Sequence, residues 1–511
     1  MRPDTPTHCA IPSPMPPSPP PAAWPGRPTS PAAVLALLAL WLLATMGLRP
    51  LMLPDEGRYS DVARQMLAGD GLTPLLNGLP FFHKPPLMYW IDMAAMSVFG
   101  VNPFAARFAP FVGAWLMGAA LFLALRRSHG PSAARWALAV LATSPYFFLG
   151  AQYANHDMLV AGLISVSVLS AVRALDDPAR RSLHWVVAAW VAAALAVLAK
   201  GLIGIVLPAL VVGPWLLAQR RWREMLRLLH PLGIVAGLAV AAPWFVAMHF
   251  RYPGFSDYFF MEQHFRRFSQ ASFNNPQPFW YFIVVLPVLT FPWSLWLWPA
   301  LRRLARERSA SLGLYAWWTV AVIGFFSIPH SKLMGYGLPA VAPFCALLAL
   351  SLAPGRATRR VLGAAALMCV GIVLFGAWQA PKSTAGGARA LAAQIQPGER
   401  VVFVDDYFFD LPFVARLRQP VIVALDWADP KLPVTDNWRK ELYDAARFDP
   451  ALGRELLWPR ERLSELVCHG HAVWFAARPA NTNWHAEVPG IEPVYADDRV
   501  QVLRAPASSC P

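Results

Sequence analysis

Eight long stretches of this chain contain no Asp, Glu, Lys or Arg, and they restrict its fold more than any other feature. A helix needs about 20 mostly apolar residues to cross the hydrocarbon core of a bilayer. Over the whole chain 56% of residues are hydrophobic and 14% are charged, which is unusually apolar for a soluble protein. The sequence therefore predicts a helical protein that crosses a membrane several times. The stretches are Pro28–Leu48, Phe108–Leu125, Trp136–His156, Ser182–Ala199, Gly201–Gln219, Ser269–Leu301, Leu333–Gly355 and Val361–Pro381.

Helices drawn through these stretches and through the other apolar runs of the chain give about eleven membrane-spanning helices. Two further segments, Tyr59–Ala68 and Pro86–Phe99, are too short to span and are expected to lie in the interface plane. The predicted fold class is therefore an all-α polytopic membrane protein with interfacial helices. The expected spans are 31–48, 104–126, 133–150, 154–173, 183–200, 202–218, 230–249, 278–300, 311–328, 333–352 and 359–379.

The positive charge of the chain predicts which face of this topology is cytoplasmic. The formal net charge is +14, and with the spans above five arginine clusters fall on one face. Because basic residues favour cytoplasmic loops, we expect the N-terminus in the cytoplasm and no binding of nucleic acid. The clusters are Arg126, Arg127 and Arg135; Arg173, Arg180 and Arg181; Arg220, Arg221, Arg223 and Arg227; Arg302, Arg303, Arg306 and Arg308; and Arg356, Arg359 and Arg360.

Composition divides the chain into three parts. Residues 1–30 are rich in proline and are expected to form a disordered cytoplasmic tail. Residues 31–381 carry the apolar runs, with a first external loop at 49–103. Residues 382–511 contain short β-branched runs, which predict a small C-terminal extracytoplasmic α/β domain to which we assign no chemistry. Its expected strands are Val401–Val404, Val421–Leu425, Ala472–Ala476 and Val500–Leu503.

Polar residues without an evident structural role gather on the opposite face. The first are Asp55 and Glu56, an acidic pair at the exit of the first expected span, where charge is costly to hold near hydrocarbon. The others come from the ends of many helices, and we expect them to line one external cavity. They are Arg58, His83, Lys84, Asn155, Asp157, Lys200, Glu262, His264, Arg266, Arg267, His330 and Lys332.

Seven short motifs follow one another over about residues 31–350. They are Asp55–Tyr59 (DEGRY), Leu76–Gly78 leading into Lys84–Trp90 (KPPLMYW), Asn155–Met158 (NHDM), Leu198–Gly201 (LAKG), Glu262–Phe268 (EQHFRRF), Gln277–Tyr281 (QPFWY), and Ser331–Leu333 with Tyr336 and Leu338–Pro339. In this order they resemble the polyprenyl-phosphate-dependent glycosyltransferases of the GT-C superfamily. The resemblance is closest to the aminoarabinose–lipid A transferases, with protein O-mannosyltransferases as more distant relatives.

The resemblance implies an enzyme of the bacterial inner membrane with its site on the periplasmic side. Its donor would be a sugar on undecaprenyl phosphate, and its acceptor lipid A or another periplasmic molecule. A phosphate leaving group needs stabilising cations rather than an acid catalyst. Arginine and lysine suit phosphate oxygens, and the expected donor-binding cations are Arg58, Lys84, Lys200, Arg266, Arg267 and Lys332.

Asp55 is the expected catalytic carboxylate, with Glu56 and Asp157 as second choices. A hydroxyl acceptor would need a base near its proton, whereas a phosphate acceptor would only need to be oriented. Structural ion pairs with Arg58 and Lys200 are the alternative for Asp55 and Asp157. The tyrosines expected to contact the sugar or the lipid headgroup are Tyr59, Tyr89 and Tyr336.

His83 and His264 could together hold a divalent metal ion, since imidazole is a common ligand. The alternative is hydrogen bonding to substrate or carboxylate, and the resemblance requires no cofactor. Three departures from the family leave the sugar and the acceptor open. His83 stands where an acidic residue is commoner, Gly57 replaces a commoner Thr, and Lys332–Tyr336 reads KLMGY rather than KLPTY.

Three other functions are compatible with a polytopic membrane protein. A transporter or flippase of lipid-linked sugars would carry its polar residues near the bilayer midplane on broken, repeated helices. Here the polar residues lie at helix ends on one face. An O-antigen ligase-like enzyme would also use a lipid-linked sugar outside the membrane, but the Asp55–Glu56 loop is not the expected hallmark of such an enzyme. A lipid-binding structural subunit would hold lipid without turnover.

Overall fold

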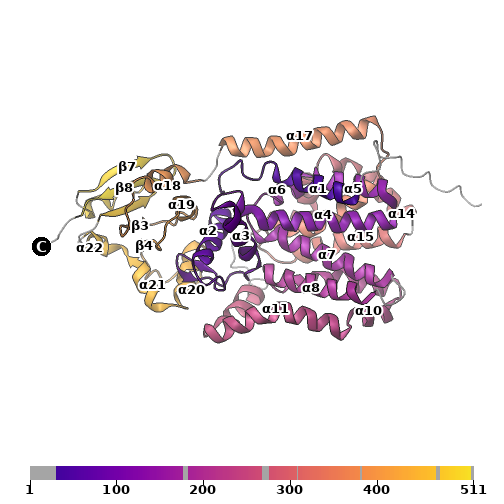
Figure 1. The fold of residues 1–511 in the computed structure, drawn as a ribbon, viewed down its shortest axis with the longest axis horizontal. Helices are drawn as coiled ribbons and strands as arrows, with labels where there is room; N and C mark the ends of the chain where they lie inside the picture. Colours follow the sequence, from indigo (N-terminus) through magenta and orange to yellow (C-terminus); the bar gives the residue numbers. More distant parts are fainter. Residues whose placement is uncertain are drawn as a thin grey trace, which may run out of the picture.

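The computed structural model of the chain describes residues 30–176, 182–266, 275–307, 309–379, 383–467, 472–488 and 490–507. The proline-rich tail predicted for residues 1–30 lies outside this part of the chain, except for its last residue. The described residues form a helical bundle with a smaller domain of strands and helices at one end (Figure 1). This is the predicted fold class.

The bundle is built mainly from long apolar helices. Six of the described helices are long and apolar enough to cross a membrane, and a seventh span results if the bent pair Tyr281–Leu289 and Trp293–Arg306 counts as one. The six are η1–α4 (Ala105–Ser128), α7 (His156–Asp176), α8 (Ser182–Lys200), α11 (Pro231–Arg251), α15 (Ala310–Ser327) and α17 (Arg356–Gln379). The chain is thus a multi-pass membrane protein.

The predicted number of eleven spans is not confirmed, because several apolar runs form shorter helices. These are α1 (Pro31–Leu43), α9 (Ile203–Ala218) and η4–α16 (Met334–Leu350). Two other expected spans are broken at prolines, which cannot donate a backbone hydrogen bond. The run 133–150 divides into α5 (Gly130–Ala142) and α6 (Pro145–Gly150), and the run 278–300 bends by 108° between α13 (Tyr281–Leu289) and η3–α14 (Trp293–Arg306).

Residues 49–103, predicted to form the first external loop, contain two helices and a tight hairpin. Helix α2 (Asp55–Ala68) follows α1, and α3 (Leu87–Phe99) precedes the next span. Between them Asn77 and Gly78, both at positive φ, turn the chain from β1 (Leu75–Leu76) into β2 (Leu79–Pro80). Most of the residues in the first two turns of α2 are buried, so this part of the helix packs against the rest of the protein.

The C-terminal domain is an α/β unit with a six-stranded sheet in the order β5-β4-β3-β6-β8-β7. The four strands β5, β4, β3 and β6 are parallel, and β8 and β7 complete the sheet as antiparallel strands. All four predicted strands are present; β5, only three residues long, and β7 were missed. The strands are β3 (Arg400–Val404), β4 (Ile422–Leu425), β5 (Leu457–Pro459), β6 (Val473–Ala477), β7 (Glu492–Ala496) and β8 (Gln501–Ala505).

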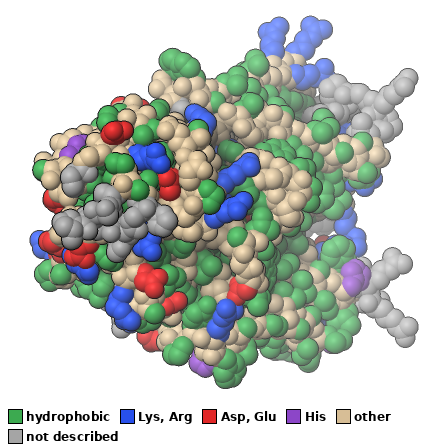
Figure 2. Space-filling model, turned by 60° about the vertical axis from the view of Figure 1, so that its left-hand side comes forward, with side chains coloured by type: hydrophobic (Ala, Val, Ile, Leu, Met, Phe, Trp, Pro, Cys, Tyr) green, Lys and Arg blue, Asp and Glu red, His purple; other side chains and the backbone are tan. Residues whose placement is uncertain are grey.

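Five short helices surround this sheet. They are α18 (Ala385–Ala392), α19 (Leu411–Ala415), α20 (Trp438–Ala446), α21 (Pro450–Leu456) and α22 (Leu463–Leu466). Charged side chains gather on the face of the sheet domain, whereas the flank of the bundle is mostly hydrophobic (Figure 2). This distribution fits a water-exposed domain at one end of a lipid-embedded bundle.

The sheet domain is fixed to the first external loop by specific contacts. The Asn77 side chain donates to the carbonyl of Val421 and accepts from its N–H, both at 2.8 Å. Helix α2 approaches the domain so closely that a Cβ added at Gly57 would lie 2.7 Å from the amide nitrogen of Asp410. The Gly57 departure from the family pattern therefore has a packing reason in this chain.

We expect the Gly57→Ala variant to loosen this docking. The added methyl group would overlap backbone atoms that cannot rotate away, which costs about 1–3 kcal/mol in a packed core. Thermal unfolding in detergent should show a lower midpoint for this variant. Gly371→Ala in α17 is the matched control, because apart from its neighbours in α17 no described residue lies within 4 Å of its added Cβ. Equal midpoints for the two variants would contradict this packing role.

Candidate active site

A small polar pocket lies where the bundle, helix α2 and the sheet domain meet. Its lining residues come from six separate segments, including the N-terminus of α7, the C-terminus of α8 and helix α20. Most of them belong to the predicted external set, so the sequence motifs do converge in space. The lining residues are Asp55, Arg58, Tyr59, His83, Lys84, Asn155, His156, Asp157, Lys200, Leu333, Tyr336 and Glu441.

Arg58 is held between helix α2 and the sheet domain. Its Nη1 lies 2.8 Å from Oε1 of Glu441, and its Nη2 lies 3.8 Å from Oδ1 of Asp55. The guanidinium also lies over the ring of Phe409, 4.8 Å from the ring centre. Burial lowers the pKa of Arg58, but the Glu441 carboxylate and its neighbours more than offset this, so the pKa is raised above its ordinary value.

Arg58 keeps donor capacity in this arrangement. Its Nε is buried and has no hydrogen-bond partner among the described residues. A buried N–H of a charged group without a partner is costly, so Arg58 still has one donor that an anion could satisfy.

Asp157 and Lys200 form the opposite wall. The Lys200 ammonium donates to Oδ1 of Asp157 and lies over the Tyr336 ring, 4.3 Å from its centre. The other oxygen of Asp157 accepts from the Asn155 side chain at 3.1 Å. The alternative reading of Asp157 and Lys200 as an ion pair is thus realised, but both groups still line the pocket.

The segment Lys332–Tyr336 approaches Asp157 through a glycine. A Cβ added at Gly335 would lie 1.9 Å from Oδ2 of Asp157, so no larger residue fits there without moving the carboxylate. The KLMGY departure is therefore coupled to the position of Asp157 in this chain.

Lys84 and His83 enter the pocket from the loop between β2 and α3. The Lys84 ammonium donates to the carbonyl of His83 at 2.9 Å. The His83 ring stacks on Phe81 with ring centres 4.5 Å apart. Both side chains therefore approach the same space as Arg58.

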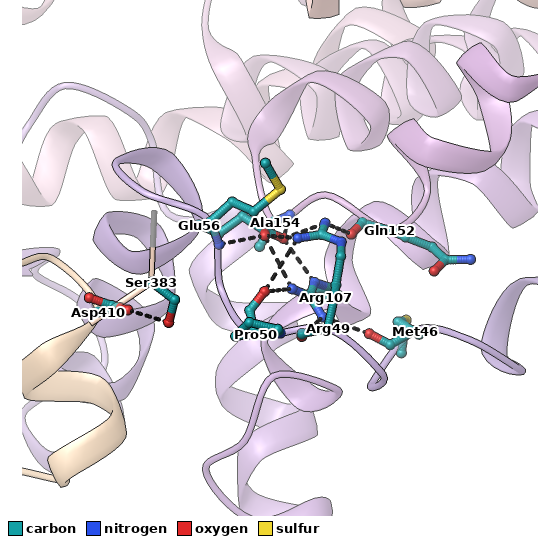
Figure 3. Close-up of polar contacts among 10 residues, drawn as sticks. Met46, Arg49, Pro50, Glu56, Arg107, Gln152, Ala154, Ser383 and Asp410 are labelled. Carbon is teal, nitrogen blue, oxygen red and sulfur yellow. Dashed lines mark hydrogen bonds and ion pairs between the residues drawn. The ribbon is translucent and has the colours of Figure 1, made fainter. Parts of the chain in front are cut away.

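Glu56 does not reach this pocket. Its carboxylate is fully buried between Arg49 and Arg107 (Figure 3), accepting from Nη2 of Arg49 at 3.1 Å and from Nε of Arg107 at 2.8 Å. The amide of Ala154 also donates to it at 2.9 Å. The geometry gives Glu56 a structural position that ties together four segments, not the catalytic one considered from the sequence.

Two other expected site residues also lie away from the pocket lining. The Lys332 ammonium is buried and donates to the carbonyls of Gln277 at 2.8 Å and Pro329 at 2.6 Å. Burial lowers the pKa of Lys332. Tyr89 is fully buried beneath the pocket, 5.3 Å from the His156 ring and 6.4 Å from the Tyr59 ring, measured between ring centres.

The other predicted site residues cannot be placed in the structure. Arg267 lies outside the described residues, and so do the side chains of His264 and Arg266. Among the described residues no three His, Cys, Asp or Glu side chains are grouped to hold a metal ion. The pairing of His83 with His264 on a metal stays a prediction.

Sequence reasoning missed Glu441 and Phe409, which hold Arg58 from the sheet domain. Both lie more than 300 positions from Arg58 in the chain, and neither belongs to a motif. His156 was also missed, although it lies inside the quoted Asn155–Met158 motif; its ring meets Tyr59 edge-on at 4.6 Å. Only the docking of the sheet domain brings Glu441 and Phe409 to the site.

Known proteins resemble this chain in sequence. Residues 83–246 match the family of dolichyl-phosphate-mannose-protein mannosyltransferases. The undecaprenyl phosphate-alpha-4-amino-4-deoxy-L-arabinose arabinosyl transferase of Pseudomonas aeruginosa is 33% identical over 320 residues, which cover 62% of this chain and 58% of that protein. The chain thus aligns with less than two thirds of the length of such relatives.

Solved structures resemble this chain over more of its length than the sequence relatives do. The crystal structure of ArnT from Cupriavidus metallidurans in the apo state matches with a TM-score of 0.78 and 25% identity, covering 94% of this chain and 98% of that one. This chain is ArnT-like in both sequence and fold. The ArnT crystal structure bound to undecaprenyl phosphate matches with a TM-score of 0.81 at 24% identity, covering 94% and 99%. The ArnT-like fold therefore extends into the sheet domain.

Proposed function

We propose that this chain is an inverting glycosyltransferase that moves a sugar from undecaprenyl phosphate to lipid A or another acceptor outside the cytoplasm. One observation carries the proposal: three cations, Arg58, Lys84 and Lys200, meet the carboxylate of Asp55 in one pocket. The name of the Pseudomonas aeruginosa relative supports 4-amino-4-deoxy-L-arabinose as the sugar. The domain limits 31–381 and 382–511 are part of the same proposal.

The cations suit a donor whose leaving group is a phosphate. As the bond between the sugar and the phosphate breaks, negative charge grows on the phosphate oxygens. Arg58 would bind one oxygen through its unpartnered Nε, and Lys84 would place a compact charge beside it. No proton needs to reach the leaving oxygen, so the site requires no acid catalyst.

Asp55 would act on the acceptor. Its side chain is 31% exposed and lies 3.8 Å from Arg58, at the edge of the cationic set. With a hydroxyl acceptor it would remove the proton during attack at the anomeric carbon. With a phosphate acceptor, already anionic, it would orient the nucleophile and balance the cations. A single displacement inverts the anomeric configuration in either case.

We assign the pocket to the periplasmic side of a bacterial inner membrane, with the N-terminus in the cytoplasm. The helices α10 (Trp222–Leu228) and α14 (Leu297–Arg306) lie at the end of the bundle away from the sheet domain (Figure 1). They carry or adjoin two of the arginine clusters. The positive-inside pattern supports a cytoplasmic location for that end.

The test is sugar transfer by the purified protein in lipid nanodiscs. With undecaprenyl phosphate-aminoarabinose and lipid A, mass spectrometry should find lipid A heavier by one sugar residue. The Lys84→Ala variant should lower kcat by about 10²-fold, because a lost charge-stabilising donor costs about 3 kcal/mol. Lys431→Ala, an exposed lysine of the sheet domain, is the control. Transfer at the wild-type rate by Lys84→Ala would contradict a role for Lys84 in stabilising the leaving phosphate.

Glu441 would be a positioning residue for Arg58. Glu441→Gln removes the charge that faces a buried guanidinium at 2.8 Å, so Arg58 should turn away from its productive orientation. We expect kcat to fall about tenfold with little change in the donor KM. A merely structural role would reduce only the folded amount, leaving kcat per folded molecule unchanged. Glu455→Gln, on the exposed face of α21, should behave like the wild type.

A further inference from the structure

A second polar hollow lies in the sheet domain, at the point where its strand order reverses. From β3 the chain proceeds outward through β4 to β5 and then returns to place β6 on the other side of β3. Open parallel sheets bind ligands at such a point, outside the carboxyl ends of the strands. Asp405 and Asp406 directly follow β3, and Arg478 directly follows β6. All three line this polar hollow, called the crevice below.

This crevice has the size and chemistry of a binding site for a charged sugar. Its volume is about 510 Å³. Arg478, whose side chain is 55% exposed, donates through Nε to Asp406. Nε of Arg499, 29% exposed, lies 3.5 Å from Oδ2 of Asp498. Both ion pairs use Nε, so the Nη groups of these two crevice-lining arginines stay outside them, and guanidinium donors match phosphate oxygens. Asp406 is a hydrogen-bond acceptor for hydroxyl or amino groups, and Trp438 adds an aromatic ring on which a sugar face can pack.

The crevice shares a wall with the candidate active site. Pro54 lines the crevice, and the next residue, Asp55, lines the pocket. Phe409 lines the crevice, and the centre of its ring lies 4.8 Å from Cζ of Arg58. On helix α20, Trp438 lines the crevice and Glu441 lines the pocket one turn later. Asp55 therefore stands at the boundary between the two.

We propose that the crevice holds the phosphorylated sugar headgroup of the acceptor and delivers it to Asp55. The inference rests on the proposed function, because it names the acceptor side of the same reaction. The donor phosphate takes the cations of the pocket, so the acceptor phosphate needs cations of its own. Arg478 and Arg499, which line the crevice, supply them.

The experiment compares binding of lipid A bisphosphate with binding of its dephosphorylated form, in nanodiscs and without donor. The wild type should prefer the phosphorylated form by about tenfold, as expected for a charge-assisted contact. The double variant Arg478→Ala/Arg499→Ala should lose this preference. Arg462→Ala is the matched control, since its side chain is 51% exposed, pairs with Glu465 and does not line the crevice.

Turnover separates this inference from the proposed function. In the double variant the KM for lipid A should rise about tenfold, while the donor KM stays within about twofold of the wild type. A wild type that binds phosphorylated lipid A through these arginines but transfers no sugar would overturn the proposed function alone. The proposed acceptor site in the crevice would be overturned if the double variant kept its preference for phosphorylated lipid A. It would also be overturned if Arg462→Ala lost that preference to the same extent.

Discussion

The Asp55→Asn variant should transfer sugar at least about a hundredfold more slowly than the wild type while still binding undecaprenyl phosphate. Asparagine keeps the size of the side chain but cannot accept a proton and carries no charge. Loss of a general base typically costs 10²- to 10⁴-fold, and a misplaced nucleophile costs about 10²-fold, so either role of Asp55 predicts this loss. Donor binding should persist, because the cations Arg58, Lys84 and Lys200 remain in place.

Asp70→Asn is a closely matched control. Asp70 lies in the same external loop, its side chain is 35% exposed against 31% for Asp55, and it also pairs with an arginine, Arg251. It does not line the pocket. Transfer should therefore survive in Asp70→Asn. If both variants retained full transfer, Asp55 would have no catalytic role, and if both lost donor binding, the effect would be structural.

The Glu56→Ala variant should be the most destabilised of the single variants proposed here. Glu56 is the only carboxylate among the labelled partners of Arg49 and Arg107 in Figure 3, and its removal would leave two buried guanidinium groups facing each other. Breaking a buried ion pair in this way costs about 3–5 kcal/mol. Thermal unfolding in detergent should show this loss. Glu224→Ala, which removes the partner of the more exposed Arg221, should cost less than about 1 kcal/mol.

The same cluster predicts how stability depends on pH. Burial opposes the charge of Glu56, but Arg107 and Arg49 outweigh it and lower its pKa from 4.5 to about 2. Because the folded-state pKa is the lower one, the contribution is fully present above pH 4.5 and is lost as the pH falls toward 2. The wild type should therefore lose stability over this window more steeply than Glu56→Gln. Parallel unfolding curves for the two proteins would contradict this reading.

The sequence was sufficient for much of the site because its motifs lie at helix ends. Asp55, Arg58, Lys84, Asp157 and Lys200 were expected on the external face, and Tyr336 was expected to contact the substrate. All six residues line one pocket. Glu56 was misplaced because successive helical residues point about 100° apart. Once α2 begins at Asp55, the side chains of Asp55 and Glu56 point in different directions, and only Asp55 lines the pocket.

Other features depended on packing that no local pattern encodes. Glu441 reaches Arg58 only because α20 docks on the bundle, where Phe448 meets the Phe82 ring at 4.9 Å between ring centres. The sequence predicted Lys332 as a site cation, yet its ammonium group donates hydrogen bonds to two backbone carbonyls and does not line the pocket. The breaks at Pro145 and Pro292 show why apolar runs alone overestimate the number of straight spans.

The most direct test of the proposed site is an experimental structure of this protein with undecaprenyl phosphate bound. The phosphate should lie in the pocket between α2 and α8, within hydrogen-bond distance of Arg58 and Lys84. The polyprenyl chain should leave along the apolar flank of the bundle. A phosphate bound elsewhere, with no phosphate density beside Arg58 or Lys84, would contradict the proposed site.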